Sequence, residues 1–152
     1  MLIITASFTL ITYHMSDTTY TAPIRLNIWQ QNLNKSAKAH WDLLNSPIHK
    51  QWDVLLLQEP YLDSYGNAKA TRDWRVVYPS SHPANDSIVR SVILVNTKLD
   101  TNHWHQVNYH DNNDTTVIQF KGPYGRLSIF NIYNDGGHSN SLTALDHYIS
   151  AN

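Results

Sequence analysis

The segment Trp52–Leu62 reads WDVLLLQEPYL and holds the feature that decides the fold. The apolar run Val54–Leu57 is followed by Gln58 and Glu59, and Pro60 ends it. An apolar run of this length without polar alternation is typical of a strand that is covered on both faces. The sequence therefore places a carboxylate at the end of a buried strand, where it is either a loop residue or part of a site.

A unit of strand, loop, helix and strand is predicted around this run. In the segment 24–28, apolar and polar residues alternate, which is the period of a strand with one buried face. The segment 37–45, AKAHWDLLN, has apolar residues at helical spacing, and Ser36 can cap its first turn. We therefore expect the strand at 24–28 and the strand at 52–58 to be neighbours in one sheet.

The rest of the chain is predicted to be mainly extended. Further strands are expected at 87–96, in TTVIQF and in RLSIFNIY, and a helix is expected over 139–152. An irregular loop is expected over 61–83. This loop either is an ordinary surface loop or contacts nucleic acid through its basic and aromatic side chains, which are Lys69, Arg72, Trp74 and Arg75. The tryptophans expected in the core are Trp29, Trp41 and Trp52.

Composition restricts the function. The chain has 152 residues and a mass of 17.5 kDa, enough for one domain with a core. Its 11 basic and 12 acidic residues give a net charge of −1, so any nucleic-acid binding must rest on a local site rather than on a general basic excess. Cysteine is absent, which excludes disulfides and thiolate metal sites and fits a reducing compartment. The expected location is intracellular, either nuclear or cytoplasmic.

Residues 1–22 are expected to be a non-structural extension, and residues 23–152 are expected to form the domain. The first fourteen residues, MLIITASFTLITYH, are apolar, but no basic residue precedes them and threonines interrupt them. A signal sequence is therefore the less favoured alternative. The segment is also too short and too polar to span a bilayer, so no membrane association is expected.

Polar side chains follow three of the predicted strands. Asn32 and Asn34 come after the first, Glu59 comes after the second, and Tyr133 and Asn134 follow the strand in RLSIFNIY. In an open sheet, ligands bind beyond the strand ends. A carboxylate with amide oxygens and no thiol suits a hard cation such as Mg²⁺, which takes one or two carboxylates and keeps several waters. The alternative is a set of solvated turn residues.

In this order, the motifs resemble those of the endonuclease/exonuclease/phosphatase superfamily, in particular the endonuclease domains of non-LTR retrotransposons. The matching motifs are IWQQNLNKS, VLLLQEPYL, SVILVN and IFNIYND, and the resemblance covers Ile24–Asn152. It implies an α/β fold, namely part of a four-layer α/β sandwich with mixed, mostly antiparallel sheets, truncated after the first half of the domain. It also implies Mg²⁺- or Mn²⁺-dependent hydrolysis of a phosphodiester, with DNA as the substrate.

The resemblance also assigns roles to single residues. Glu59 matches the family's metal-binding glutamate, and Asn32 matches the asparagine near the metal. Tyr133 matches the active-site tyrosine that contacts the scissile phosphate. Asn34 stands where many members have aspartate, and Asn134 follows the tyrosine directly, whereas the family usually has Y-x-P-N. Glu59 and Asn32 are thus the candidate metal ligands, and the candidate catalytic residues are Tyr133, Asn134 and Asn34.

Two motifs of the family's later half, G-D-x-N and S-D-H, are absent from the chain. In the family, their side chains help to activate water and complete the site. The letters LDH at Leu145–His147 lie in the predicted C-terminal helix and are expected on the surface. Two alternatives to a DNA endonuclease therefore stay open. One is a non-catalytic, truncated remnant of the domain, and the other is a phosphatase or phosphoesterase of the same superfamily acting on a small molecule or lipid headgroup.

Overall fold

The computed structural model describes residues 3–8, 25–82, 88–109, 113–122, 125–134, 136–137 and 139–151. The elements follow the order β1 (Ile3–Phe8), β2 (Leu26–Asn32), α1 (Ala37–Asn45), the 3₁₀ helix η1 (Pro47–Lys50), β3 (Val54–Gln58), β4 (Trp74–Val77), β5 (Ser91–Asn96), β6 (Trp104–Gln106), β7 (Thr115–Gly122), β8 (Gly125–Ile132) and α2 (Asn140–Ala151).

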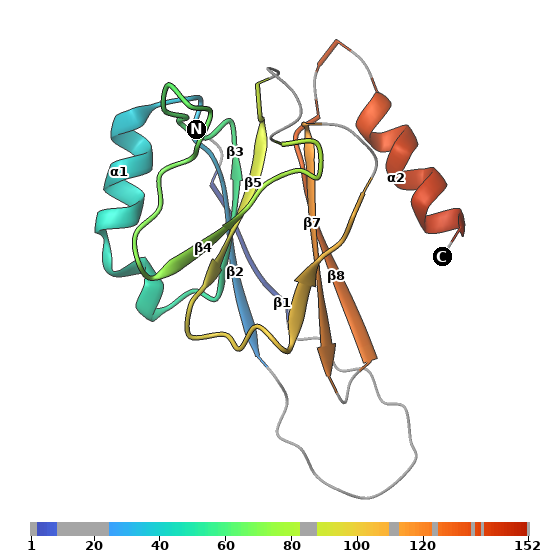
Figure 1. Ribbon diagram of the computed structural model, residues 1–152, viewed down its shortest axis with the longest axis horizontal. Helices are drawn as coiled ribbons and strands as arrows, with labels where there is room; N and C mark the ends of the chain where they lie inside the picture. Colours follow the sequence, from blue (N-terminus) through green and yellow to red (C-terminus); the bar gives the residue numbers. More distant parts are fainter. Residues whose placement is uncertain are drawn as a thin grey trace, which may run out of the picture.

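The strands form two sheets that pack face to face. The order in the five-stranded sheet is β1-β2-β3-β5-β4, and the order in the three-stranded sheet is β6-β7-β8. Helix α1 lies on the outer side of the first sheet, and α2 lies on the outer side of the second (Figure 1). Strands β2 and β3 are parallel, whereas the other paired strands are antiparallel. The chain is thus a four-layer α/β sandwich with mixed, mostly antiparallel sheets, as the sequence predicts.

Strands β3 and β5 form the centre of the fold because both of their faces are buried. In β3, Leu55 and Leu57 belong to the apolar cluster on the side of α1, whereas Val54 belongs to the cluster between the sheets. All three side chains are 0% exposed. Fully burying a side chain of this kind contributes about 1.5–3 kcal/mol relative to leaving it in water. The apolar run lacks polar alternation for this reason, and the prediction of a strand covered on both faces is confirmed.

The predicted unit of strand, helix and strand is also confirmed. Strands β2 and β3 are parallel neighbours, and the Ser36 Oγ accepts a hydrogen bond of 3.2 Å from the Ala39 N–H at the start of α1. The buried residues of this helix are His40 and Leu44. The expectation that Trp41 lies in the core is wrong, since its side chain is 41% exposed. Adjacent helical residues point about 100° apart, so burying His40 turns Trp41 toward solvent.

Trp29 and Trp52 fit the expectation better. They are partly buried and pack against the α1 side of the core. Their ring centroids lie 5.2 Å apart in an edge-to-face arrangement, which is a favourable geometry for two aromatic rings.

The segment 61–83 is not irregular throughout, because Trp74–Val77 form β4 and pair with β5. Trp74 is 5% exposed and lies in the core, so the hypothesis that it contacts nucleic acid is wrong. The Arg75 Nη1 donates a hydrogen bond of 3.3 Å to the backbone carbonyl of Leu99. A four-residue strand among many turn residues is too short for a clear periodic pattern, which explains why the sequence predicted a loop.

Strand β1 lies within the segment 1–22 that the sequence predicts to be a non-structural extension. It pairs antiparallel with β2, with Ile3 opposite Gln31 and Phe8 opposite Leu26. Isoleucine and threonine favour extended backbone, and the edge of β2 offers backbone groups that need partners. Ile3–Phe8 are therefore part of the sheet. Residues 9–22 lie outside the described residues, and the domain boundaries stay a prediction.

Helix α2 confirms the helix predicted near the end of the chain. It packs through an aromatic cluster, in which the Tyr148 ring centroid lies 5.5 Å from that of Phe130 and 5.4 Å from that of Tyr109. Asp146 and His147 are exposed, as predicted for the LDH letters. Among the residues that the structure describes, no helix is long and apolar enough to cross a bilayer.

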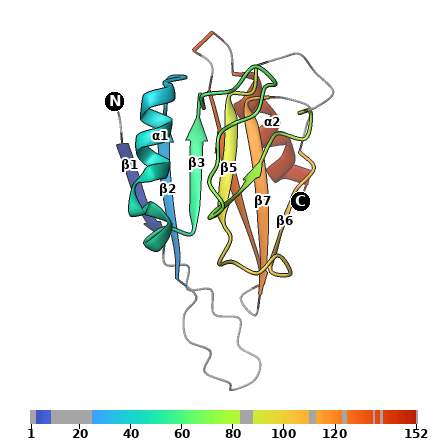
Figure 2. The same cartoon turned by 60° about the vertical axis from the view of Figure 1, so that its left-hand side comes forward.

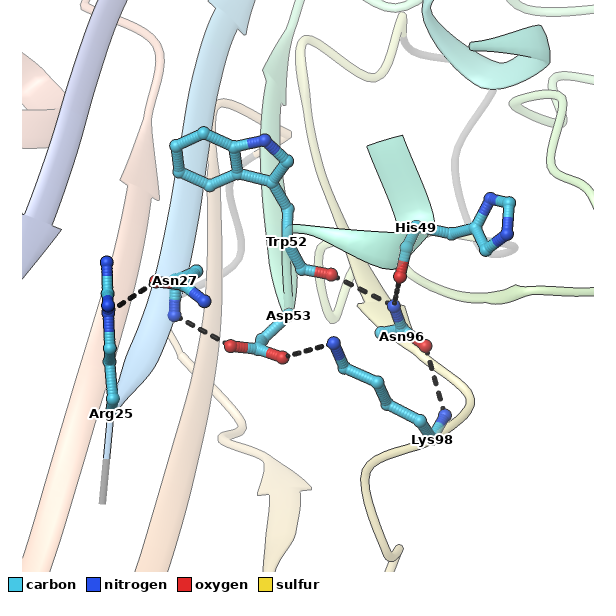
Figure 3. A network of polar contacts seen from close by, with 7 residues as sticks. All are labelled: Arg25, Asn27, His49, Trp52, Asp53, Asn96 and Lys98. Carbon is cyan, nitrogen blue, oxygen red and sulfur yellow. Dashed lines mark hydrogen bonds and ion pairs between the residues drawn. The ribbon is translucent and has the colours of Figure 1, made fainter. Parts of the chain in front are cut away.

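A polar network closes the end of the five-stranded sheet that lies opposite Glu59 (Figure 3). Asp53, which is 6% exposed, accepts a hydrogen bond of 2.7 Å from the Asn27 N–H, and its other oxygen lies 2.9 Å from the Lys98 Nζ. The buried Asn96 amide donates to two backbone carbonyls of the segment 49–52, at 2.7 and 2.9 Å. These bonds tie the starts of β2 and β3 to the end of β5 and fix their register.

Candidate functional site

The candidate residues after β2 and β3 lie at one edge of the five-stranded sheet. Because these strands are parallel, they end on the same side, and Asn32 is the register partner of Gln58. Strand β3 ends at the top of the molecule in Figure 2. Neighbouring strands lie about 4.8 Å apart, so Asn32 is close to the start of the turn that carries Glu59. The Asn32 Oδ1 accepts a hydrogen bond of 2.8 Å from the Asn34 N–H, which holds the turn after β2.

Glu59 is the single glutamate of the chain, and its backbone has a positive φ of 45°. This left-handed conformation is uncommon for a residue with a Cβ. Two backbone hydrogen bonds of 2.8 Å hold it, one from the Glu59 N–H to the Arg90 carbonyl and one from the Lys35 N–H to the Glu59 carbonyl. The side chain is partly buried. Within the described part of the chain, no group donates a hydrogen bond to its carboxylate and no cation pairs with it.

The second sheet brings Tyr133 to the same edge. Tyr133 follows β8 directly, and its N–H donates a hydrogen bond of 2.7 Å to the Asp114 carbonyl before β7. The Gln58 side chain donates a hydrogen bond of 2.6 Å to the carbonyl of Ile132. Gln58 and Ile132 immediately precede Glu59 and Tyr133, so this bond joins the two strand ends just where the candidate residues begin.

Buried polar residues strengthen the connection between the sheets. The Asn131 amide, 2% exposed, donates to the Leu57 and Val92 carbonyls at 2.9 Å each. The fully buried Ser91 hydroxyl donates to the Asn131 carbonyl at 2.8 Å. A buried polar group without a partner costs about 1–3 kcal/mol, so these groups specify one alignment of β3, β5 and β8. The distance between Glu59 and Tyr133 is therefore set by the core and not by flexible loops.

Arg90 completes the cluster from the residue before β5. Its guanidinium lies 5.3 Å from the centroid of the Tyr133 ring, which is within the range of a cation–π contact. Its Nε lies 3.6 Å from the Asp114 carboxylate. Through its backbone carbonyl it also holds Glu59, at 2.8 Å. Arg90 thus contacts both the turn of the candidate metal ligand and the ring of the candidate phosphate ligand.

The structure brings Asn32, Asn34, Glu59 and Tyr133 to one edge, and Asn134 is exposed directly beside Tyr133. Their roles stay predictions. The sequence did not single out the residues that align this edge, which are Gln58, Arg90, Ser91 and Asn131. One signal was available, because Ser91 and Asn131 are polar residues inside apolar strands. Buried polar residues in such positions are usually hydrogen-bonded for a structural or functional reason.

The donor chemistry at this edge fits a hard cation. Glu59 would hold it through its carboxylate and Asn32 through its Oδ1, which accepts one hydrogen bond and retains a second lone pair. Over the described ranges, no place gathers three or more His, Cys, Asp or Glu side chains. Glu59 and Asn32 together would supply one carboxylate and one amide oxygen, and water and substrate oxygens would complete the shell, which is how Mg²⁺ is commonly bound.

No protein-family model and no curated protein matches the sequence. Among solved structures, the chain is similar to one described as "Endonuclease domain of TRAS1, a telomere-specific non-LTR retrotransposon", with a TM-score of 0.62 and 19% sequence identity. The match covers 82% of this chain but 52% of that chain, so this chain spans about half the length of the similar structure. The chain therefore shares the fold of about half of that domain.

Proposed function

We propose that the chain is part of a Mg²⁺- or Mn²⁺-dependent phosphodiesterase that hydrolyses DNA, an endonuclease of the retrotransposon type. The main support for the proposal is the backbone conformation of Glu59 together with the surroundings of its carboxylate. A non-glycine residue with φ of 45° follows a buried strand, and its partly buried carboxylate has no donor within the described residues. Strained backbone of this kind persists where the surrounding structure imposes it, and it clusters at functional sites. The fold similarity to an endonuclease domain supports DNA as the substrate.

The cation, when bound, would act as a Lewis acid that stabilises negative charge on the phosphate. Glu59 and Asn32 would hold the cation from two neighbouring strand ends. The Tyr133 hydroxyl donates a hydrogen bond to a non-bridging phosphate oxygen, and the cation–π contact with Arg90 fixes the ring that carries this hydroxyl. The amide groups of Asn34 and Asn134 are further donors for phosphate oxygens.

Cation binding by the chain itself tests the role of Glu59. We expect Glu59→Gln to weaken Mn²⁺ binding by at least about tenfold, because an amide replaces the carboxylate that would hold the cation. Electron paramagnetic resonance of free Mn²⁺ during a titration measures this directly and needs no catalytic activity. Competition by Mg²⁺ then gives the affinity for the second cation.

Asp146→Asn is the matched control, since Asp146 is exposed on α2 and loses the same charge. It should bind Mn²⁺ like the wild type. Equal affinity of Glu59→Gln and the wild type for Mn²⁺ would remove Glu59 from the metal site. Nicking of supercoiled plasmid should be measured in parallel, both for this chain and for the chain extended by any in-frame downstream sequence of its gene. If either of these two proteins nicks the plasmid in the presence of Mg²⁺, Glu59→Gln should abolish that nicking.

A non-catalytic remnant of the domain is the second candidate. The two candidates differ in the same titration. The remnant predicts that the wild type binds Mn²⁺ as weakly as Glu59→Gln does, whereas the phosphodiesterase predicts a clear difference.

A further inference from the structure

Two touching turns contain non-glycine residues with left-handed backbone. Among the described residues, the non-glycine residues with positive φ are Asn34 (48°), Lys35 (55°) and Glu59 (45°). The turn Leu33–Ser36 is closed by a hydrogen bond of 2.9 Å from the Ser36 N–H to the Leu33 carbonyl. Turns with two successive left-handed residues favour glycine, asparagine or aspartate. The conformational preferences of the turn therefore do not explain why position 35 is lysine.

The Lys35 backbone is bonded directly to the candidate metal site. Its N–H donates a hydrogen bond of 2.8 Å to the carbonyl of Glu59, and the Leu33 N–H donates one of the same length to the carbonyl of Gln58. The turn after β2 and the turn after β3 thus form one unit. A side chain on Lys35 is held within a few ångströms of the Glu59 backbone by this contact.

The ammonium group of Lys35 has no acidic partner in the part of the chain that the structure describes. Its side chain is exposed, and no carboxylate pairs with its ammonium group among the residues that the structure describes. By contrast, Lys38 is paired with Asp42 at 2.5 Å, and Lys69 lies 3.7 Å from Asp63. Because the chain carries a net charge of −1, it has no general positive field to attract a polyanion. Electrostatic attraction of a polyanion must therefore come from single basic side chains close to the site.

We propose that Lys35 binds a backbone phosphate of the DNA strand adjacent to the Glu59 site. The inference rests on the proposed function, since it takes DNA as the ligand. The strained turn holds the Lys35 backbone against the turn of Glu59, so the ammonium group on its flexible stem can reach a phosphate close to the one at Glu59 in the same strand. Lys35 is in this sense a substrate-positioning residue, and it has no part in activating water.

The salt dependence of DNA binding tests the inference without any cleavage. Fluorescence anisotropy of a labelled DNA duplex, measured with EDTA over a series of salt concentrations, gives the slope of log K against log [salt]. Each lost phosphate contact lowers this slope by about 0.9. We expect a loss of about this size in Lys35→Gln and Lys35→Gly, and the wild-type slope in Lys35→Arg.

Two controls separate the contact from general effects of charge and folding. Lys50→Gln removes the same charge from η1, at the opposite end of the sheet, and should keep the wild-type slope. Glycine accepts left-handed backbone without strain, so the thermal midpoint Tm of Lys35→Gly should not fall below that of the wild type. A lower slope without a lower Tm cannot come from unfolding.

Three outcomes would overturn the inference. The first is a wild-type slope in Lys35→Gln, and the second is an equal loss in Lys50→Gln. The third is a wild-type chain that does not bind duplex DNA at all, which would also overturn DNA as the proposed substrate. If Lys35 behaves as expected while Glu59→Gln still binds Mn²⁺ like the wild type, the phosphate contact stands and only the metal role of Glu59 fails.

Discussion

The backbone at Glu59 carries strain that the neighbouring sequence does not require. A residue with a Cβ in left-handed helical conformation costs roughly 1–2 kcal/mol. Hydrogen bonds from both sides hold Glu59 in this state, through the Arg90 carbonyl and the Lys35 N–H. Glycine would adopt the same φ without a Cβ clash, although it loses more conformational freedom on folding. Relief of the Cβ clash therefore favours glycine over glutamate at this position, and the presence of glutamate is not explained by folding stability.

Comparison of two substitutions at this position isolates the strain. We expect Glu59→Gly to have a free energy of unfolding about 1 kcal/mol higher than Glu59→Ala, because only alanine keeps the clash of the Cβ. Urea unfolding followed by tryptophan fluorescence measures both values. At Asp146, inside α2, the order should reverse, since glycine is less favourable than alanine in a helix. A more stable alanine variant at position 59 would show that φ of this residue is not strained.

The place of Glu59 could be predicted from the sequence, but its conformation could not. An apolar run followed by a charged residue and Pro60 indicates a strand end. The left-handed φ depends on the Arg90 carbonyl, which lies 31 positions later in the chain and reaches Glu59 only through pairing of β3 with β5. No local pattern contains that information.

At the level of elements, two polar networks lie at opposite ends of β3, and they have different structural roles. At its start, the carboxylate of Asp53 accepts a hydrogen bond from the Asn27 N–H in β2 and pairs with Lys98 in the turn after β5. At its end, Gln58 bonds the carbonyl of Ile132 in the other sheet. The first network fixes the register of neighbouring strands, and the second aligns two sheets around the candidate site.

The first network should be measurable as stability. Asp53→Ala leaves the Asn27 N–H without its acceptor in a partly buried region, so we expect a loss of about 1–3 kcal/mol in the free energy of unfolding. Lys98→Gln should cost less than about 1 kcal/mol, because the Lys98 side chain is 47% exposed and solvent screens the pair. Urea unfolding of both variants tests this order. Equal losses would mean that the ion pair, and not the backbone hydrogen bond, dominates.

Helices and strands whose apolar residues recur at a regular spacing were predictable from the sequence. Contacts between elements that are distant in the sequence were not. The strand-helix-strand unit from β2 to β3 combines a period of two, a capping Ser36 and a buried apolar run, and it was predicted. Strand β4 was missed because Trp74–Val77 is too short to show a period. The hydrogen bonds of Asn131 to Leu57 and Val92 span 74 and 39 positions, and only the packing of the two sheets creates them.

On the scale of the whole molecule, α1 and the segment after Glu59 are linked through a buried histidine. His40 is 0% exposed. Burial lowers the pKa of His40 from its ordinary value of 6.5, and the nearby backbone of Lys69 and Tyr61 partly offsets this effect. The neutral form is therefore the form that the folded chain favours.

The stability of the chain should consequently fall on acidification. As the pH drops below about 6.5, the unfolded chain takes up a proton at His40 before the folded chain does, so the free energy of unfolding decreases until the pH passes the lowered pKa. At pH values above the ordinary pKa, His40 is neutral in both the folded and the unfolded chain, so it does not make the free energy of unfolding depend on pH. We expect the loss between pH 7.5 and pH 5.5, measured by urea unfolding, to be smaller in His40→Leu than in the wild type.

His147→Leu serves as the control, since His147 is exposed on α2 and should leave the loss between the two pH values unchanged. If His40→Leu and the wild type lose the same stability on acidification, another group is responsible for the effect.

The backbone strain in the two touching turns also has a consequence for mutational drift. At Asn34, Lys35 and Glu59, substitution by glycine carries little or no penalty in folding. Folding alone would therefore not remove glycine at these positions from related sequences. If the three side chains are retained in related sequences, their retention would indicate selection on something other than folding.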